Sequence, residues 1–318
     1  MPRARDSFSL GHVKVRPGAQ RDVLLPITRL VTGGDVSLPV RVVHGKEPGP
    51  VVWVNGAVHG DEVVGVEIIR QVLGSLSPKT MRGTLLAVPV VNVLGFMAGD
   101  RYLPDRRDLN RSFPGSTRGS LAGRLAHLFM TQVVSKSEVG IDLHTGADRR
   151  ANHPQIRGDL DDPRTLHLAR AFGAPVILHA RLRDGSLRQA ARERGACVLL
   201  YEGGENLRLD PYAVDAGVAG VRNVLAALGM IDSPERTETE PTTRECRSSE
   251  WVRARRSGML RLDVALGAEV TDGERLGTLY DAFGRTLRAV YASRSGVVIG
   301  RTEAPVVHRG DAVVHIAS

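Results

Sequence analysis

The feature that most constrains the fold is the alternation of short, continuously apolar segments with amphipathic segments. The apolar segments are rich in Val, Ile and Leu and are bounded by turn residues, as strands buried on both faces are. They are residues 36–43, 50–54, 84–91, 139–143, 175–178 and 196–201. The segments between them have helical character and are residues 63–73, 121–134, 163–172, 186–194 and 211–228. The alternation predicts an α/β fold, in which a largely parallel sheet has helices on both faces.

The pattern changes near residue 232. Residues 232–248 are polar, rich in Thr and Glu, and contain two prolines, which is typical of a linker. From residue 249 onward, short strand-like runs alternate with glycine-centred turns. We therefore expect a large domain over 1–231, a linker over 232–248 and a small all-β domain over 249–318, beside the mouth of any crevice in the large domain. A tyrosine of that small domain, Tyr280 or Tyr291, is expected to approach the crevice.

The net charge of +8 raises the question of nucleic-acid binding. Phosphate recognition needs cations clustered on one face, whereas the arginines here are scattered through every segment. Aromatic residues, which stack on bases, make up only 4% of the chain. These observations argue against a nucleic-acid partner. An electropositive crevice that attracts acidic small molecules remains compatible with them.

Cysteine content and hydropathy indicate the compartment. Cys197 and Cys246 are too few for a disulfide framework, which fits the reducing cytoplasm. The N-terminal segment lacks the apolar stretch of a signal peptide. The most apolar stretch, residues 84–99, is interrupted by Pro89 and Asn92 and is too short to span a bilayer. We expect a soluble cytoplasmic protein with no membrane partner, and the sequence leaves a homo-oligomer open.

Two histidines and a glutamate follow predicted strands. The sequence NGAVHGDE places His59 and Glu62 three residues apart, directly after the strand at 50–54, in a glycine-flanked turn. The H-x-x-E spacing alone is a weak signal. Further along, GIDLHTG places His144 directly after the strand at 139–143. Open α/β sheets bind ligands at the carboxyl ends of their strands. A His–Glu–His set there is the composition of a catalytic zinc site that leaves one coordination position for water.

A fourth candidate is Glu202 in LLYEGGEN, at the end of the strand at 196–201. A glutamate close to a metal site but not bound to the metal can serve as the general base for an activated water. Glu205 is the competing candidate, although it lies beyond two glycines and farther from the strand. The long irregular segment 92–120, rich in Gly, Pro, Arg and Asp, is the kind of loop that is functional or disordered.

These motifs, together with DLNRSFPG at 108–115, resemble the succinylglutamate desuccinylase/aspartoacylase family. The resemblance spans roughly residues 50–230 and implies the mixed, largely parallel sheet of the zinc carboxypeptidases. It also implies one Zn²⁺ per chain, bound by His59, Glu62 and His144, with Glu202 as the general base.

The family's substrate-binding residues can be carried over as well. Its Asn–Arg pair, which binds a substrate carboxylate, corresponds to Asn110 and Arg111. Its arginine that polarises the scissile carbonyl corresponds to Arg101. Because the stretch between Arg101 and Asn110 is longer here, Arg106 or Arg107 remains an alternative for that role. Arg157, in a region with no clear counterpart in the family, is a candidate for a second carboxylate contact.

The resemblance implies hydrolysis of the amide bond of an N-acyl amino acid or a similar compound. The same fold and metal ligands could instead serve a metallocarboxypeptidase that acts on short or cell-wall peptides. A third interpretation is a protein of a different class, which binds a metal or a small molecule without catalysis. The presence of Glu202 beside a complete set of ligands argues against loss of activity.

Overall fold

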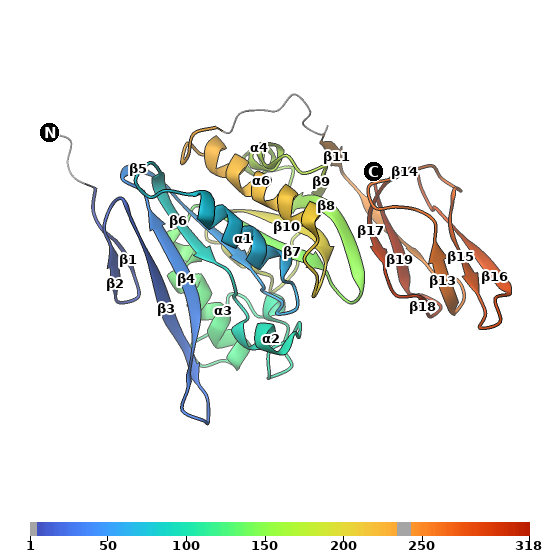
Figure 1. Cartoon of the computed structure of the whole chain (residues 1–318), viewed down its shortest axis with the longest axis horizontal. Helices are drawn as coiled ribbons and strands as arrows, with labels where there is room; N and C mark the ends of the chain where they lie inside the picture. Colours follow the sequence, from blue (N-terminus) through green and yellow to red (C-terminus); the bar gives the residue numbers. More distant parts are fainter. Residues whose placement is uncertain (1–4, 234–242) are drawn as a thin grey trace.

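The computed structural model describes residues 5–233 and 243–318. A single 13-stranded sheet runs through the chain, and its main path is β12-β19-β17-β8-β10-β7-β5-β6-β4-β3. Helices cover both faces of its central part (Figure 1). The predicted α/β class is therefore confirmed. No helix in the described ranges is long and apolar enough to cross a membrane.

Parallel strands form the centre of the sheet, and antiparallel strands extend it on both sides. The parallel strands are β6 (Arg82–Val88), β5 (Glu47–Gly56), β7 (Val139–Gly146) and β10 (Cys197–Glu205). The extension beyond β6 consists of β4 (Asp35–His44) and β3 (Ala19–Arg29). The extension beyond β10 consists of β8 (Arg150–Gly158), β17 (Gly296–Thr302), β19 (Ala312–Ala317) and β12 (Ser249–Arg253). Because β5, β7 and β10 are parallel, their carboxyl ends meet at one edge.

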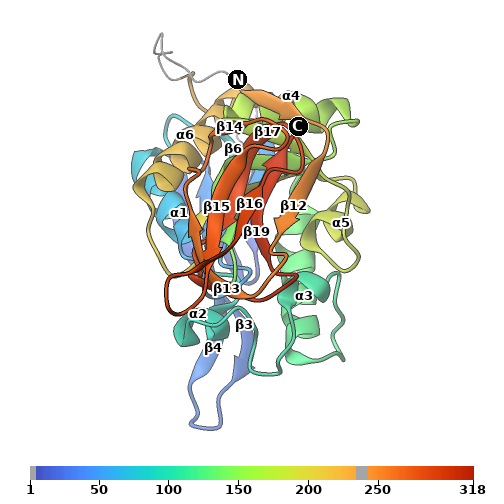
Figure 2. The same cartoon turned by 90° about the vertical axis from the view of Figure 1, so that its right-hand side faces the viewer.

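Shorter strands branch from this sheet or lie outside it. Those joined to it are β9 (Val176–His179), β11 (Arg244–Cys246) and β14 (Glu269–Val270). An N-terminal hairpin pairs β1 (Phe8–Leu10) with β2 (Val13–Val15). A second, four-stranded sheet contains β13 (Gly258–Leu262), β15 (Arg275–Tyr280), β16 (Thr286–Tyr291) and β18 (Val306–Val307). Figure 2 shows this sheet in front of β19.

All but the first of the described α-helices begin directly after a residue whose side chain caps them. Asp162 accepts a hydrogen bond from the backbone N–H of Thr165, and Pro163 occupies the first turn, where its missing N–H costs nothing. Asp210 and Pro211 start the last helix in the same way. The helices are α1 (Val64–Ser75), α2 (Val93–Ala98), α3 (Leu121–Gln132), α4 (Pro163–Phe172), α5 (Leu187–Arg192) and α6 (Pro211–Ala227), with 3-10 turns η1 (Leu109–Arg111) and η2 (Val134–Lys136).

Two apolar cores lie on the two faces of the sheet. One contains buried residues of α1, α4 and α6, and the other contains those of α3 and α5. A glycine makes room for a large side chain on the neighbouring strand. A Cβ on Gly140 of β7 would lie 2.0 Å from the Trp53 ring of β5. The large indole ring therefore fits against the neighbouring strand only because that strand has no side chain there.

The apolar pattern misses several strands, each for an identifiable reason. The segment that forms β8, RANHPQIRG, is too polar to resemble a buried strand, yet most of its residues are buried between β10 and β17. The N-terminal strands β1, β2 and β3 are also missed, since they are short or alternate weakly. The segment 92–120 is less irregular than predicted, because it contains α2 and η1.

The C-terminal strands are continuous with the 13-stranded sheet. Strand β17 pairs with β8, with Gly300 opposite Asn152, so hydrogen bonding crosses the predicted boundary at residue 248. Residues 234–242 of the predicted linker lie outside the described residues, and its described C-terminal end contains β11, which pairs with β9. The C-terminal strands still have an apolar core of their own. The division into 1–231, 232–248 and 249–318 therefore stays a prediction. The structure shows that strand pairing joins the first and the last of these ranges.

Candidate active site

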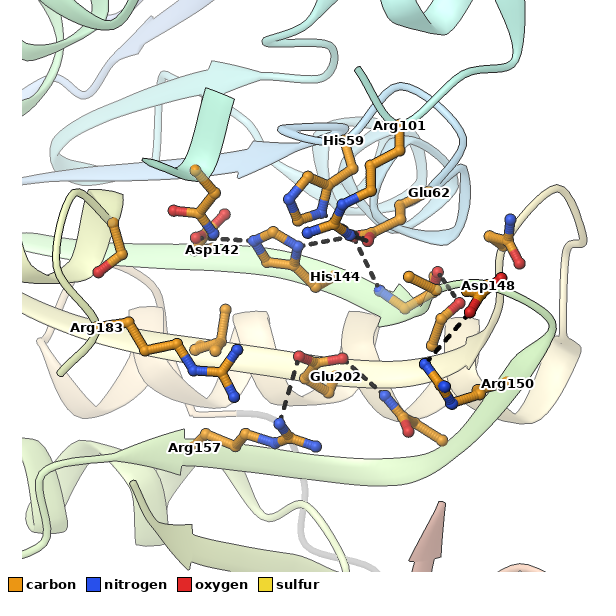
Figure 3. A pocket seen from close by; sticks show the side chains of 18 of the residues that line it. His59, Glu62, Arg101, Asp142, His144, Asp148, Arg150, Arg157, Arg183 and Glu202 are labelled. Atoms are coloured by element: carbon orange, nitrogen blue, oxygen red, sulfur yellow. Dashed lines mark hydrogen bonds and ion pairs between the residues drawn. The ribbon is translucent and has the colours of Figure 1, made fainter. Parts of the chain in front are cut away.

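A cavity of about 1480 Å³ opens at the carboxyl ends of β5, β7 and β10. The sequence-predicted residues that line it come from six separate segments of the chain. They are His59, Glu62, Arg101, Asn110, Arg111, His144, Arg157 and Glu202. The fold thus brings every one of these candidates to a single cavity (Figure 3).

His59 and Glu62 lie in the turn between β5 and α1. This turn packs tightly against α2, since a Cβ on Gly60 would lie 2.0 Å from the carbonyl carbon of Gly95. Glycine is therefore required at that point. The turn points both side chains into the cavity, where His59 Nδ1 lies 2.7 Å from Glu62 Oε1. Both side chains are almost completely buried.

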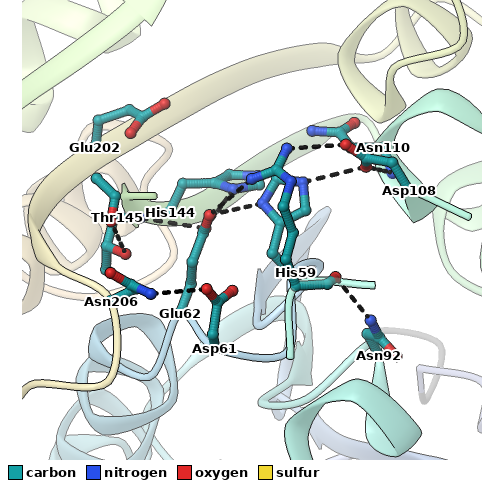
Figure 4. Close-up of polar contacts among 12 residues, drawn as sticks. His59, Asp61, Glu62, Asn92, Asp108, Asn110, His144, Thr145, Glu202 and Asn206 are labelled. Carbon is teal, nitrogen blue, oxygen red and sulfur yellow. Dashed lines mark hydrogen bonds and ion pairs between the residues drawn. The ribbon is translucent and has the colours of Figure 1, made fainter. Parts of the chain in front are cut away.

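His144 joins them from the end of β7. Its Nδ1 lies 2.7 Å from the second carboxylate oxygen of Glu62, which also accepts a hydrogen bond from the backbone N–H of Thr145. One ligand atom from each of His59, Glu62 and His144 can be chosen so that all lie within 4.8 Å of one another. Figure 4 shows both imidazoles beside the Glu62 carboxylate, with a dashed line from the carboxylate to each. This is the spacing that three ligands of one cation need.

The other nitrogen of each imidazole faces a carboxylate. His144 Nε2 lies 3.0 Å from Asp142 Oδ2, and His59 Nε2 lies 3.3 Å from Asp108 Oδ1. Neither contact has the geometry of a hydrogen bond among the described residues, but a carboxylate this close favours a proton on Nε2, and that would leave Nδ1 available to a metal. The sequence reasoning did not single out Asp142 or Asp108, although both lie inside the motifs that it used, GIDLHTG and DLNR.

A buried polar chain fixes Asp142 in turn. The indole N–H of Trp53 donates to Asn55 Oδ1 over 2.8 Å, and the Asn55 amide donates to Asp142 Oδ1 over 2.6 Å. All of these groups lie in the interior of the sheet, where an unsatisfied polar atom would be costly. The orientation of His144 is therefore set by β5 as well as by its own strand.

The electrostatics of the site favour a cation. Burial by itself favours the neutral form of Glu62, but His59 and His144 outweigh it and hold the pKa of the Glu62 carboxyl well below its ordinary value. Burial likewise opposes the charged form of His144, but Asp142 and Glu62 raise the pKa of its imidazole well above the ordinary value. Several buried carboxylates thus stabilise positive charge at one point. A divalent cation at the same donor atoms fits both this charge and the His–Glu–His chemistry.

Arg101 is the arginine that reaches this cluster. Its Nη2 lies 2.9 Å from Asp108 Oδ2, and its Nη1 lies 3.6 Å from Glu62 Oε1. Arg106 and Arg107, the alternatives for the carbonyl-polarising role, are exposed and do not line the cavity. The geometry therefore favours Arg101 among the three.

Glu202 lies at the end of β10, in register with His144 of β7. Asn152 of β8 donates a hydrogen bond to Glu202 Oε2 over 2.7 Å, and Arg157 Nη1 lies 3.8 Å from Oε1. In Figure 4 the carboxylate stands apart from the His59–Glu62–His144 cluster. The competing Glu205 does not line the cavity, and its carboxylate lies 3.1 Å from Arg208.

The C-terminal strands support this arrangement through Gly300. A Cβ on Gly300 would lie 2.8 Å from Asn152 Oδ1, so the missing side chain leaves room for the amide that holds Glu202. Local sequence patterns gave no signal for either Asn152 or Gly300, because their proximity depends on the pairing of β8 with β17.

Asn110 and Arg111 lie on η1, at the wall of the cavity. Asn110 Oδ1 accepts a hydrogen bond from the backbone N–H of Leu187, the first residue of α5, over 2.9 Å. The oxygen of this amide therefore serves as a structural clamp, and its amide nitrogen remains for other partners. Arg111 Nη1 donates to the carbonyl of Asn110 over 2.6 Å.

The C-terminal strands also line the cavity directly, through residues other than the predicted tyrosines. Trp251 of β12 and His315 of β19 face it with their rings stacked, 4.4 Å apart at 12°. Arg150 lies over the Trp251 ring at 5.4 Å from its centre. Neither Tyr280 nor Tyr291 is among the described lining residues, so that expectation is wrong. Both belong to the second sheet, which lies beyond β19.

Comparison with known proteins agrees with the fold. The model of the succinylglutamate desuccinylase/aspartoacylase catalytic domain matches residues 48–228. An N-alpha-acetyl-L-2,4-diaminobutyric acid deacetylase from Halomonas elongata is 32% identical over 296 residues, which cover 89% of this chain and 86% of that protein.

Solved structures extend the likeness to the whole chain. A succinylglutamate desuccinylase/aspartoacylase from Rhodobacter sphaeroides superposes with a TM-score of 0.84 at 29% identity, covering 99% of this chain and 96% of its own. The product-bound ectoine utilization protein EutE from Ruegeria pomeroyi gives the same TM-score at 24% identity, with coverage of 100% and 97%, and supports the fold.

The fold and the cavity define an α/β protein with a candidate metal site at the carboxyl ends of its central strands. The chain belongs to the succinylglutamate desuccinylase/aspartoacylase family, a family of deacylases. The resemblance drawn from H-x-x-E, DLNR, DLHTG and the glutamate at a strand end is therefore confirmed.

Proposed function

We propose that this chain is a zinc-dependent hydrolase that cleaves the amide bond of an N-acyl amino acid, releasing a carboxylate and an amine. The observation that carries the proposal is the convergence of His59, Glu62 and His144, with Glu202 near them but held by other partners. A complete ligand set with a separate carboxylate is what hydrolysis by an activated water requires.

Zinc would be held by Nδ1 of His59, Nδ1 of His144 and the carboxylate of Glu62. When bound there, it acts as a Lewis acid and lowers the pKa of a bound water to about 7. The negative charges of Asp108 and Asp142, 3.3 Å and 3.0 Å from Nε2 of His59 and His144, would favour the imidazole protons on those nitrogens, away from the ligand position.

Glu202 is the proposed general base. Its carboxylate takes a proton from the attacking water and afterwards delivers one to the nitrogen of the leaving amine, which balances the cleavage of the C–N bond. Asn152 and Arg157 hold the two oxygens of Glu202, so the carboxylate is oriented before the substrate arrives.

Arginines would orient the substrate. Arg101 is placed beside Glu62 and can stabilise the negative charge that develops on the carbonyl oxygen. Arg111, with the free amide nitrogen of Asn110, is suited to a substrate carboxylate, which a guanidinium binds in a bidentate manner. Arg157 is a further candidate for a carboxylate contact, in addition to its contact with Glu202.

The deacetylase from Halomonas elongata supports an acyl amino acid as the substrate class. The test is a panel of N-acetyl and N-succinyl amino acids and of dipeptides, with zinc-loaded protein and release of the free amine as the measurement. Turnover of acyl amino acids above that of dipeptides is expected. Faster cleavage of dipeptides would indicate a carboxypeptidase instead. Tight zinc binding without turnover of any compound would indicate a binding protein and refute the proposal.

A further inference from the structure

Asn92 is a buried polar residue that the proposed reaction does not use. In the sequence it is only a polar interruption of an apolar stretch. In the structure it directly precedes α2, and none of its surface is exposed. A buried amide needs hydrogen-bond partners for both its oxygen and its nitrogen. The partners of Asn92 belong to two different segments that border the active site.

The amide oxygen holds the start of α2. Asn92 Oδ1 accepts a hydrogen bond from the backbone N–H of Gly95 over 2.9 Å and so caps the helix. Gly95 is also the residue that Gly60 of the ligand turn packs against. The backbone N–H of Asn92 donates to the carbonyl oxygen of Ala57, at the start of the same turn, over 2.8 Å. Asn92 therefore supports the turn that carries two of the proposed zinc ligands.

The amide nitrogen holds the backbone of Arg101. Asn92 Nδ2 donates to the carbonyl oxygen of Arg101 over 3.3 Å, and Figure 4 draws this bond as a dashed line from Asn92. Among the described residues, no other hydrogen bond involves the backbone of Arg101. The fit around the amide is close, since a Cβ on Gly95 would lie 2.4 Å from Nδ2. The main chain at Arg101 is thus anchored through Asn92.

The position of a guanidinium depends on both ends of the arginine. The tip of Arg101 is anchored by Asp108 over 2.9 Å and lies 3.6 Å from Glu62 Oε1. The other end is main chain outside any helix or strand, shortly after α2 ends at Gly99. A donor to a developing oxyanion is effective when it is held in place before the reaction. A displacement of about 1 Å can cost about 100-fold in rate, so the main-chain anchor matters as much as the contact with Asp108.

We propose that Asn92 is a positioning residue, which sets the distance between the Arg101 guanidinium and the turn that carries His59 and Glu62. This inference rests on the proposed function, in which Arg101 stabilises the charge on the carbonyl oxygen. One planar amide holds both sides, because its oxygen holds α2 behind the turn and its nitrogen holds Arg101. Asn92 is not among the described residues that line the cavity, so it acts only through these neighbours.

Two substitutions separate the two hydrogen bonds. Asn92→Ser keeps an oxygen that can cap α2, since serine is a favoured N-cap residue, but it lacks the amide nitrogen that reaches Arg101. Asn92→Asp keeps the size and the cap, and it places an oxygen instead of a donor opposite the Arg101 carbonyl. Each should lower kcat on an N-acyl amino acid about 10- to 100-fold, with KM and zinc content unchanged. A residue needed only for the helix cap would tolerate both changes.

A double-mutant cycle shows whether the loss passes through Arg101. Arg101→Met by itself should lower kcat about 10²–10³-fold, as removal of an oxyanion donor does. In that background Asn92→Ser should lower kcat by less than about 3-fold more. Equal losses from Asn92→Ser in the two backgrounds would overturn the inference.

Ser120→Ala is the control for the loss of a helix cap. Ser120 caps α3, which contributes no residue to the described lining of the cavity. The substitution should lower the melting temperature by about 2–4 °C and leave kcat unchanged. Asn92→Ser should show the opposite pattern, a lower kcat with little change in the melting temperature.

A crystal structure of Asn92→Ser gives a readout that needs neither turnover nor zinc. The guanidinium of Arg101 should move away from Glu62, while α2 still begins at the same residue. If the unmodified zinc-loaded protein hydrolyses no acyl amino acid, the proposed function fails, and this structure still tests the positioning. An Arg101 guanidinium that keeps its place in the variant would contradict the role assigned to Asn92.

Discussion

The contact between Asp142 and His144 offers the sharpest test of how the site is built. Asp142 faces two donors, since Oδ1 accepts from the Asn55 amide over 2.6 Å and Oδ2 lies 3.0 Å from His144 Nε2. In Asp142→Asn only one oxygen remains, so an NH₂ group must face either Asn55 or His144. If it faces His144, the imidazole proton moves to Nδ1, the nitrogen that would bind zinc.

The magnitude follows from these contacts. Loss of an outer carboxylate partner typically lowers metal affinity about 10- to 100-fold. That loss corresponds to about 1.4–2.8 kcal/mol in the free energy of zinc binding. If the amide turns toward Asn55 instead, a buried donor is left unsatisfied, and the free energy of unfolding falls by about 1–3 kcal/mol. The substitution should therefore weaken zinc binding, or stability, or both.

The assay is the zinc dissociation constant from competition with a chelator, measured beside thermal unfolding of the metal-free protein. Asp61→Asn is the matched control, because Asp61 is a buried carboxylate in the same cavity whose partner is Asn206. It makes the same change of charge without facing an imidazole nitrogen. His144→Ala defines the loss of a ligand itself. Unchanged zinc affinity and stability in Asp142→Asn would refute the proposed role of this contact.

The remaining predictions concern catalysis. Glu202→Gln should keep its zinc, as elemental analysis would show, while turnover falls about 10²–10⁴-fold. Glu205→Gln is the control. A near-normal kcat in Glu202→Gln would mean that Glu202 is not the general base. Arg111→Ala should raise KM for substrates with a free α-carboxylate and spare the corresponding amides, as steady-state kinetics would show. Gly300→Ala should displace Asn152 and lower kcat about 10- to 100-fold at unchanged zinc content, whereas Gly74→Ala, whose Cβ would meet nothing within 4 Å, should have no effect.

The sequence by itself determined the α/β class and the candidate chemistry. Periodicity and turn residues locate the ends of β5, β7 and β10, and motifs place His59, His144 and Glu202 at or just beyond those ends. Parallel strands present their carboxyl ends at one edge, so convergence follows from local patterns alone. The family could be recognised for the same reason, since its motifs are short and contiguous.

Only the tertiary structure decided which residues support these groups. Asn152 reaches Glu202, and Gly300 makes room for it, because β8 pairs with a strand more than a hundred residues later. Likewise Trp251 and His315, rather than a tyrosine, line the cavity because β12 and β19 continue the 13-stranded sheet. Such pairings depend on register between distant segments, and no local period in the sequence encodes that register.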